Sequence, residues 1–184
     1  MCGGSRATFE QVRPLFAAIA ANVFHVGPVG AGHTIKLINN YLGQVSVAAI
    51  SEMLPLAARC GVDPAALFDV VSVSGGNSRV FQGLVPRLQR RDFAVHFRQK
   101  YVYKDLRYIN GLAQEEQCPV RLAPALLALH AEALAQGYGE EDFSALLKFW
   151  EAMGNAGRDR HAETVEQKET LKMPPEPSGG GGAE

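Results

Sequence analysis

Apolar side chains recur at the spacing of an α-helix along most of the first 153 residues. The longest apolar stretch, residues 31–59, is far too long for a buried strand and predicts a core helix that Pro55 kinks. Only residues 23–26, Val-Phe-His-Val, have the pattern of a short strand. The predicted helices cover residues 5–20, 31–59, 64–72, 79–90, 97–117, 122–136 and 143–153.

Short polar residues stand where several of these helices should begin. Ser5 or Thr8 can cap the first helix, and Asp63 followed by Pro64 is a typical start for the third predicted helix. Asp142 precedes the last helix in the same way. These signals indicate a helical domain with a short α–β piece at its beginning.

The segment from residue 154 to residue 184 has a different composition. Only six of its 31 residues are apolar, and it ends in a proline-rich and glycine-rich stretch. Such a segment buries too little surface to offset the entropy lost on ordering, so it predicts a disordered tail.

Charge and cysteine content exclude several classes of protein. The 184 residues contain 18 Lys and Arg against 19 Asp and Glu, a net charge of −1 that gives no reason to expect nucleic-acid binding. No apolar run reaches the roughly 18 residues of a membrane-spanning helix, and no secretory signal is visible. Cys2, Cys60 and Cys118 lie far apart, which argues against disulfides and a zinc site. We therefore expect a cytoplasmic protein that binds no metal.

The segment from residue 27 to residue 40 is the most informative for chemistry. Its glycines partly match a phosphate-binding loop, but His33 occupies the place of the essential lysine. They also partly match the dinucleotide fingerprint Gly-x-Gly-x-x-Gly, but Ile35 stands at the third glycine and no βαβ unit follows. Both matches are incomplete.

Three polar residues follow these glycines on one face of the long helix: Lys36, Asn39 and Asn40. A lysine in a partly dry site loses its proton more easily, which suits proton transfer. The alternative is a helix start at the surface, with Lys36 in water and an asparagine capping a neighbouring element. The pattern alone leaves both interpretations open.

Lys104 is a second candidate, because it shares a helical stripe with Phe97, Tyr101 and Tyr108. A cation among aromatic rings can clamp a ligand or form a cation–π pair at the surface. Both possibilities stay open at this point.

Three separated segments resemble, in the right order, the β-hydroxyacid dehydrogenase family. Residues 27–40, Gly-Pro-Val-Gly-Ala-Gly-His-Thr-Ile-Lys-Leu-Ile-Asn-Asn, resemble the interdomain-helix motif of that family. Phe97 followed by Lys-Asp-Leu at 104–106 resembles its second signature, and residues 137–138 with 142–145 resemble the entry to its final helix. The resemblance covers about residues 3–153.

The resemblance implies a fold and a division into domains. The fold would be mainly α, the all-helical C-terminal domain of a 6-phosphogluconate-dehydrogenase-like architecture. Residues 1–26 would be the remnant of an N-terminal Rossmann domain, residues 27–153 the helical catalytic and oligomerisation domain, and residues 154–184 the disordered tail. The helical part would also join copies of the chain into a homo-oligomer.

The resemblance also implies roles for individual residues. Lys36 would exchange a proton with the hydroxyl of a small β-hydroxyacid, and Asn40 would hold the substrate and the lysine in register. Asn39 would contact the substrate as well. The residues that would contact NAD or NADP are Lys104, Gly32 and Phe97.

Two features of that family are not found in the sequence. They are the Gly-x-Gly-x-x-Gly fingerprint of the N-terminal Rossmann domain and the Ser-Gly-Gly substrate loop of that domain; the Ser-Gly-Gly at residues 74–76 lies in a predicted turn between two helices instead. We therefore expect the 184-residue chain to lack dehydrogenase activity by itself. The alternative hypothesis is a non-enzymatic helical dimerisation module derived from the family.

Overall fold

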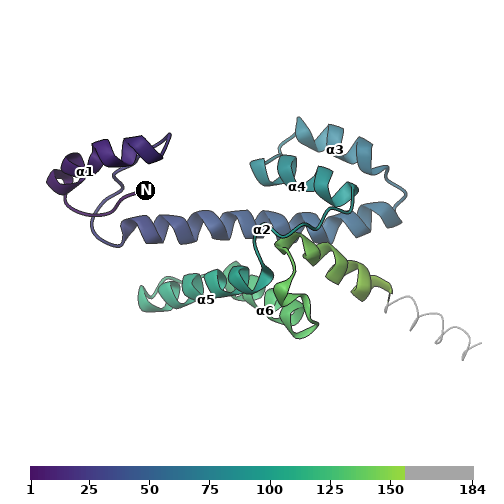
Figure 1. Cartoon of the computed structure of the whole chain (residues 1–184). Helices are drawn as coiled ribbons and strands as arrows, with labels where there is room; N and C mark the ends of the chain where they lie inside the picture. Colours follow the sequence, from purple (N-terminus) through teal and green to yellow (C-terminus); the bar gives the residue numbers. More distant parts are fainter. Residues whose placement is uncertain (156–184) are drawn as a thin grey trace, which may run out of the picture.

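The computed structural model describes residues 1–155, and the described part is built from helices (Figure 1). Within that part no strand forms, which confirms the mainly α fold class. Helical backbone also extends over 146–155, so Gly154 and Asn155 continue the last helix instead of starting the tail. The rest of the predicted tail lies outside the described residues. The named elements are α1 (Arg6–Ile19), α2 (Ala31–Arg59), α3 (Pro64–Ser72), α4 (Arg79–Gln89), α5 (Gln99–Glu115), α6 (Leu122–Ala135), and the short 3₁₀ helices η1 (Tyr138–Glu140) and η2 (Phe143–Ala145).

The predicted helix starts are confirmed at three places. The Ser5 side chain accepts a hydrogen bond from the backbone N–H of Thr8 and caps α1, so Ser5 is the cap of the two candidates. Asp63 accepts from the N–H of Ala65 at the start of α3. Asp142 caps η2, which leads into the last helix.

The strand prediction for residues 23–26 is wrong. His25 forms one isolated parallel bridge with Cys2, held by hydrogen bonds from Cys2 N–H to Phe24 O and from Val26 N–H to Cys2 O. A strand needs neighbours to pair with along its length, and within residues 1–155 the only extended segment beside this one is the first few residues.

The first segment also packs tightly against the start of α2. A side chain on Gly3 would place its Cβ 2.4 Å from the carbonyl oxygen of Pro28, and one on Gly32 would lie 3.2 Å from the Met1 oxygen. Only glycine allows the two backbones to approach so closely.

α2 forms the axis of the molecule, with α3 and α4 along one side and α5 and α6 along the other (Figure 1). α1 lies near the beginning of α2. Pro55 lies inside α2, and the kink there stays a prediction. The core forms where α2, α4, α5, α6 and the last helix meet, and it consists of Val47, Ala48, Leu84, Leu88, Val102, Leu106, Leu126, Ala133, Leu146, Leu147 and Phe149.

A buried histidine links α6 to the start of α5. The Nδ1 atom of His130 lies 2.9 Å from the Oε1 atom of Gln99, and the Gln99 amide donates to the carbonyl oxygen of Phe143. An amide oxygen only accepts, so Nδ1 carries the proton and Nε2 is left without a partner among the described residues. Burial lowers the pKa of His130 to about 4, so the ring is neutral at pH 7.

We predict that His130 makes the fold less stable on acidification. The unfolded chain takes up the proton near pH 6.5, whereas the folded chain resists it down to about pH 4. The stability is therefore fully present above pH 6.5, and the loss from this group approaches about 3 kcal/mol near pH 4. Guanidinium unfolding at pH 7.5, 5.5 and 4.5 measures it. The Gln99→Met/His130→Leu variant is the control and should lose less stability over this interval; an equal pH dependence in both proteins would contradict the prediction.

Candidate active site

The carboxylate of Asp105 on α5 is the common hydrogen-bond partner of two polar side chains of α2. The Oδ2 atom of Asp105 lies 2.5 Å from the Nζ atom of Lys36 and 2.7 Å from the Nδ2 atom of Asn40. Lys36 and Asn40 are one helical turn apart, so both donors reach the same oxygen. Asp105 thus fixes the lysine and the amide relative to each other.

Asp105 reaches this position because it lies on the buried stripe of α5, beside Val102 and Leu106. Its side chain is only 6% exposed. Burial alone would raise the pKa of Asp105, but hydrogen bonds from Lys36, Asn40 and Lys104 outweigh it and the pKa lies below its ordinary value. The carboxylate is therefore ionised at neutral pH.

Lys104 completes the cluster from the same helix. Its Nζ atom lies 3.2 Å from the Oδ1 atom of Asp105, and 5.9 and 5.8 Å from the ring centres of Tyr101 and Tyr108. The predicted stripe therefore brings a cation between two aromatic rings. Two lysines against one aspartate leave the cluster with a charge of +1, and the Lys36 and Lys104 side chains are 43% and 50% exposed. The cluster can receive an anion from solvent.

The geometry agrees in full with neither of the two interpretations of Lys36. The side chain is paired with a buried carboxylate, so it does not simply extend into water. It is also substantially exposed, so the dry surroundings considered from the sequence are not found among the described residues.

The other predicted site residues lie outside this cluster. Asn39 is exposed, and its amide contacts only the Oδ1 atom of Asn40, at 3.5 Å. Gly32 lies one turn before Lys36, where it contacts the first residues of the chain. Phe97 precedes α5 and packs against the core, with its ring 5.9 Å from that of Tyr101.

Asp105 has no role among the predicted site residues, although it stands in the Lys-Asp-Leu motif at 104–106. A signal for that role was present, because Val102, Asp105, Leu106 and Ile109 follow the i, i+3, i+4, i+7 spacing of a buried helix face. An acid on such a face needs a cationic or hydrogen-bonding partner.

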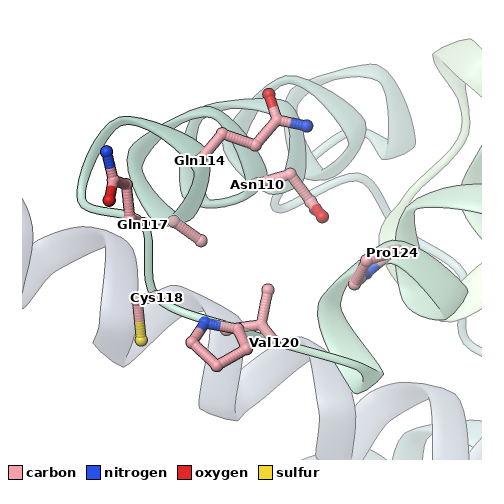
Figure 2. Close-up of a pocket in the computed structure, with 8 residues that line it drawn as sticks. Asn110, Gln114, Gln117, Cys118, Val120 and Pro124 are labelled. Carbon is pink, nitrogen blue, oxygen red and sulfur yellow. The ribbon is translucent and has the colours of Figure 1, made fainter.

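A cavity of about 330 Å³ lies elsewhere, between the end of α5 and the start of α6 (Figure 2). None of the predicted site residues lines it, and it contains no acidic or basic side chain. The amide of Asn110 donates to the carbonyls of Leu106 and Ala123, so this residue braces the two helices. We assign no chemistry to this cavity.

Residues 1–155 contain neither a cluster of metal ligands nor a membrane-spanning helix. Three or more His, Cys, Asp or Glu side chains that could hold a metal ion do not come together in this part of the chain. Its helices are too short or too polar to cross a membrane.

Comparison with known proteins decides the family. Residues 30–150 match the family model described as the NAD-binding domain of NADP-dependent 3-hydroxyisobutyrate dehydrogenase. The chain belongs to this family. The match confirms the resemblance to β-hydroxyacid dehydrogenases and the prediction that NAD or NADP is the cofactor.

Individual relatives agree with the family. The chain is 31% identical to 2-(hydroxymethyl)glutarate dehydrogenase of Eubacterium barkeri, over 83% of this chain and 51% of that protein. It is 33% identical to L-threonate dehydrogenase of Cupriavidus necator, over 86% of this chain and 54% of that protein. The crystal structure of 3-hydroxyisobutyrate dehydrogenase from Salmonella typhimurium superposes with a TM-score of 0.73 at 34% identity, covering 80% of this chain and 52% of that one. The chain thus spans about half the length of these relatives.

Proposed function

We propose that the chain is the helical half of an NAD(P)-dependent dehydrogenase that acts on a small β-hydroxyacid. The observation that carries this proposal is that Lys36 and Asn40 both donate hydrogen bonds to the same carboxylate oxygen of Asp105. A lysine held in this way is a proton-transfer group with a fixed direction. The membership in the dehydrogenase family supplies the reaction class.

The proposed chemistry divides between the cofactor and the chain. Bound NAD or NADP would supply the hydride acceptor for the carbon that carries the substrate hydroxyl. After its resting proton has passed to solvent, the Nζ atom of Lys36 takes the hydroxyl proton, and the Asp105 carboxylate stabilises the ammonium group that forms again. Because Lys36 is partly exposed, the proton can pass on to solvent. Asn40 keeps the lysine in register through its bond to the same carboxylate.

The positive charge of the cluster supports an anionic substrate. A β-hydroxyacid carries a carboxylate at neutral pH, and one such charge neutralises the excess cation of the cluster. We propose that Asn40 and Asn39 contact this substrate, with Asn39 at the exposed edge.

The cofactor contacts that we propose are Lys104, Phe97 and Gly32. A half-exposed lysine between aromatic rings fits a ligand that combines phosphate groups with flat rings. Gly32 would keep the backbone clear for close approach at the start of α2.

Replacing Lys104 by alanine should raise the KM for the cofactor about tenfold, with a smaller effect on kcat, because a single charge contact with a bound ligand is removed. Steady-state kinetics of a complete enzyme that contains this chain measures both constants. Lys100→Ala is the matched control, since Lys100 is engaged by Glu140 at 2.7 Å. An unchanged cofactor KM in the Lys104→Ala variant would refute the assignment.

We propose the domain limits that the sequence indicated, except that Gly154 and Asn155 belong with the last helix of the helical domain. Residues 1–26 would belong to the cofactor-binding domain, which the parallel bridge between Cys2 and His25 supports. The apolar side chains of Leu15 and Ile19 on α1 are exposed, as expected if further structure covers them. Residues 27–153 would form the catalytic and oligomerisation domain of a homo-oligomer. The three free thiols fit a reducing cytoplasm.

The test compares the chain alone with the chain fused behind the cofactor-binding half of an L-threonate dehydrogenase. Absorbance of NADH or NADPH is followed with 3-hydroxyisobutyrate, L-threonate, L-serine and 2-(hydroxymethyl)glutarate. We expect turnover of at least one acid by the fusion and none by the chain alone. A folded fusion that binds NAD(P) but oxidises no acid would favour the non-enzymatic dimerisation module.

A further inference from the structure

A hollow of about 340 Å³ opens between the last turns of α2 and the end of the last helix. Three large apolar side chains line it: Met53, Leu56 and Met153 are 49%, 52% and 42% exposed. The two helices diverge at this end of the molecule (Figure 1). None of the elements within residues 1–155 closes the hollow, so its apolar lining is a surface that lacks a neighbour.

The hollow also contains an unused hydrogen-bond donor. Trp150 lines it, and the Nε1 atom of the indole is buried without an acceptor in the described part of the chain. A buried donor without an acceptor is uncommon in a finished interior. An occupant that fits the hollow therefore offers both an apolar surface and a free carbonyl oxygen.

Two opposite charges stand along the α2 side of the hollow. Glu52 and Arg59 both line it, two turns apart on one face of the helix, or about 10 Å along its axis. Neither forms an ion pair with another residue of the range 1–155. The Arg59 guanidinium lies against Gly154 in the last helix. The positive end of the hollow is therefore the end at which the last helix finishes.

The chain continues from this same point. Gly154 lines the hollow, and the chain goes on to residue 184 after the described part ends at residue 155. Residues 171–177 of this continuation read Leu-Lys-Met-Pro-Pro-Glu-Pro. The family match ends at residue 150, so it gives this segment no role.

The composition of residues 171–177 favours one extended conformation. Three of its last four residues are proline, which favours the polyproline II helix. That helix has three residues per turn, so Leu171, Pro174 and Pro177 lie along one edge. Its backbone makes no internal hydrogen bonds, which leaves every carbonyl oxygen free to accept. The segment thus offers the two features that the hollow needs.

We propose that residues 171–177 dock into this hollow of their own chain as a polyproline II segment. The edge of Leu171, Pro174 and Pro177 packs on the apolar lining, and a backbone carbonyl accepts a hydrogen bond from Trp150 Nε1. Aromatic-lined grooves bind proline-rich segments in this way, because such segments lose little entropy on binding.

The charges set the direction of the docked segment. Lys172 and Glu176 flank its apolar edge, and four residues at 3.1 Å each separate them by about 12 Å. Glu52 and Arg59 have nearly the same spacing and the opposite order of charge. The segment therefore runs parallel to α2, with Lys172 beside Glu52 and Glu176 beside Arg59.

The length of the connection favours the chain's own segment over other occupants. Leu171 follows Asn155 by 16 residues, and a random-coil connection of that length spans roughly 20 Å. The segment has to return only over the two turns of α2 between Arg59 and Glu52. Such a connection gives an effective concentration on the order of millimolar. The proposal does not depend on the dehydrogenase function, because none of these residues belongs to the proposed active site.

Fluorescence of Trp150 tests whether the hollow is filled, because this is the only tryptophan in the chain. In the full chain Leu171→Asp should shift the emission to longer wavelength and at least double the rate constant for quenching by acrylamide. Val165→Asp is the matched control, since it makes the same kind of change six residues before the segment, and it should change neither quantity. Circular dichroism verifies that both variants are folded. Equal quenching in the natural chain and in Leu171→Asp, or an equal rise in both variants, would overturn the proposal.

An exchange of charges tests the direction. Glu52→Lys and Lys172→Glu should each increase the quenching of Trp150, and the double variant should return it toward the natural value, because the ion pair forms again with its signs reversed. Arg59→Glu combined with Lys172→Glu is the control for a mismatched pair and should show no recovery. A double variant of residues 52 and 172 that is quenched as strongly as the single variants would refute the parallel arrangement.

A disulfide distinguishes the chain's own hollow from that of a second copy. Cys60 is an exposed free thiol beside Arg59, and Ser178 follows Glu176 by two residues. With oxidised glutathione as the electron acceptor, Ser178→Cys should form a disulfide with Cys60 inside one chain, at least fivefold faster than Ala162→Cys does. Peptide mapping identifies the bonded pair. Equal rates in the two variants, or disulfide-linked dimers in place of the internal bond, would overturn the proposal.

Discussion

Replacing Lys36 by alanine should lower kcat of the complete enzyme about a thousandfold. The amine is the proposed proton acceptor, and Lys104 is not positioned to replace it, because its Nζ atom approaches the opposite oxygen of Asp105. The fold should persist, since the side chain is partly exposed and alanine favours helix. Initial rates with a hydroxyacid and NAD(P), together with circular dichroism, measure both effects.

Lys36→Arg is the control that separates charge from proton transfer. Arginine keeps a cation beside Asp105 but does not give up its proton at accessible pH. This variant should bind substrate and remain nearly inactive. Turnover within about fivefold of the natural enzyme in the alanine variant would end the assignment of Lys36 as the acid–base group.

Replacing Asp142 by alanine should lower the free energy of unfolding by about 3–5 kcal/mol. The buried carboxylate accepts from the backbone N–H groups of His96, Phe97 and Ser144 at 2.8, 3.0 and 3.1 Å, and from the Ser144 hydroxyl at 2.6 Å. Its removal leaves the two buried donors of Ser144 and the two part-buried backbone donors of His96 and Phe97 without this acceptor. Guanidinium unfolding at pH 7 measures the loss, with Asp69→Ala on the exposed side of α3 as the control. A loss below about 1 kcal/mol would show that water replaces the carboxylate.

The contribution of Asp142 also depends on pH. Burial raises the pKa of this carboxyl, but the hydrogen bonds from Ser144, Phe97 and His96 outweigh burial, and the pKa lies below the ordinary 3.8. The carboxylate therefore stabilises the fold fully above that value, and its contribution is lost as the pH falls through the lower pKa of the folded state. The difference between the natural chain and Asp142→Ala should shrink under those acidic conditions.

Local signals in the sequence were enough to predict most helices. Asp63 and Pro64 mark the start of α3, and the long apolar run marks α2 with the same limits that the structure shows. These features depend on capping and helix propensity, which act between residues close in the chain. The strand at residues 23–26 depends on pairing with distant residues, and there the prediction was wrong.

The site was predictable only in part, for a similar reason. Asn39 and Asn40 are equivalent in the pattern, yet only Asn40 points to α5, because neighbouring residues on a helix are about 100° apart. Packing across the whole domain decides which face of α2 is covered by α5. The same packing places Asp105 against Lys36. The motif contains this residue, but the helical periodicity alone does not assign it a function.

The close contact of Gly3 with the Pro28 carbonyl limits how the two halves of the proposed enzyme can move. The backbones touch at the turn that leads into α2, eight residues before Lys36, and leave no room for sliding. A hinge there would tilt the first segment and the lysine together instead of separating them. The distance between the cofactor half and the reactive amine would then be conserved through opening and closing, and a side chain as small as that of alanine at residue 3 would lengthen it.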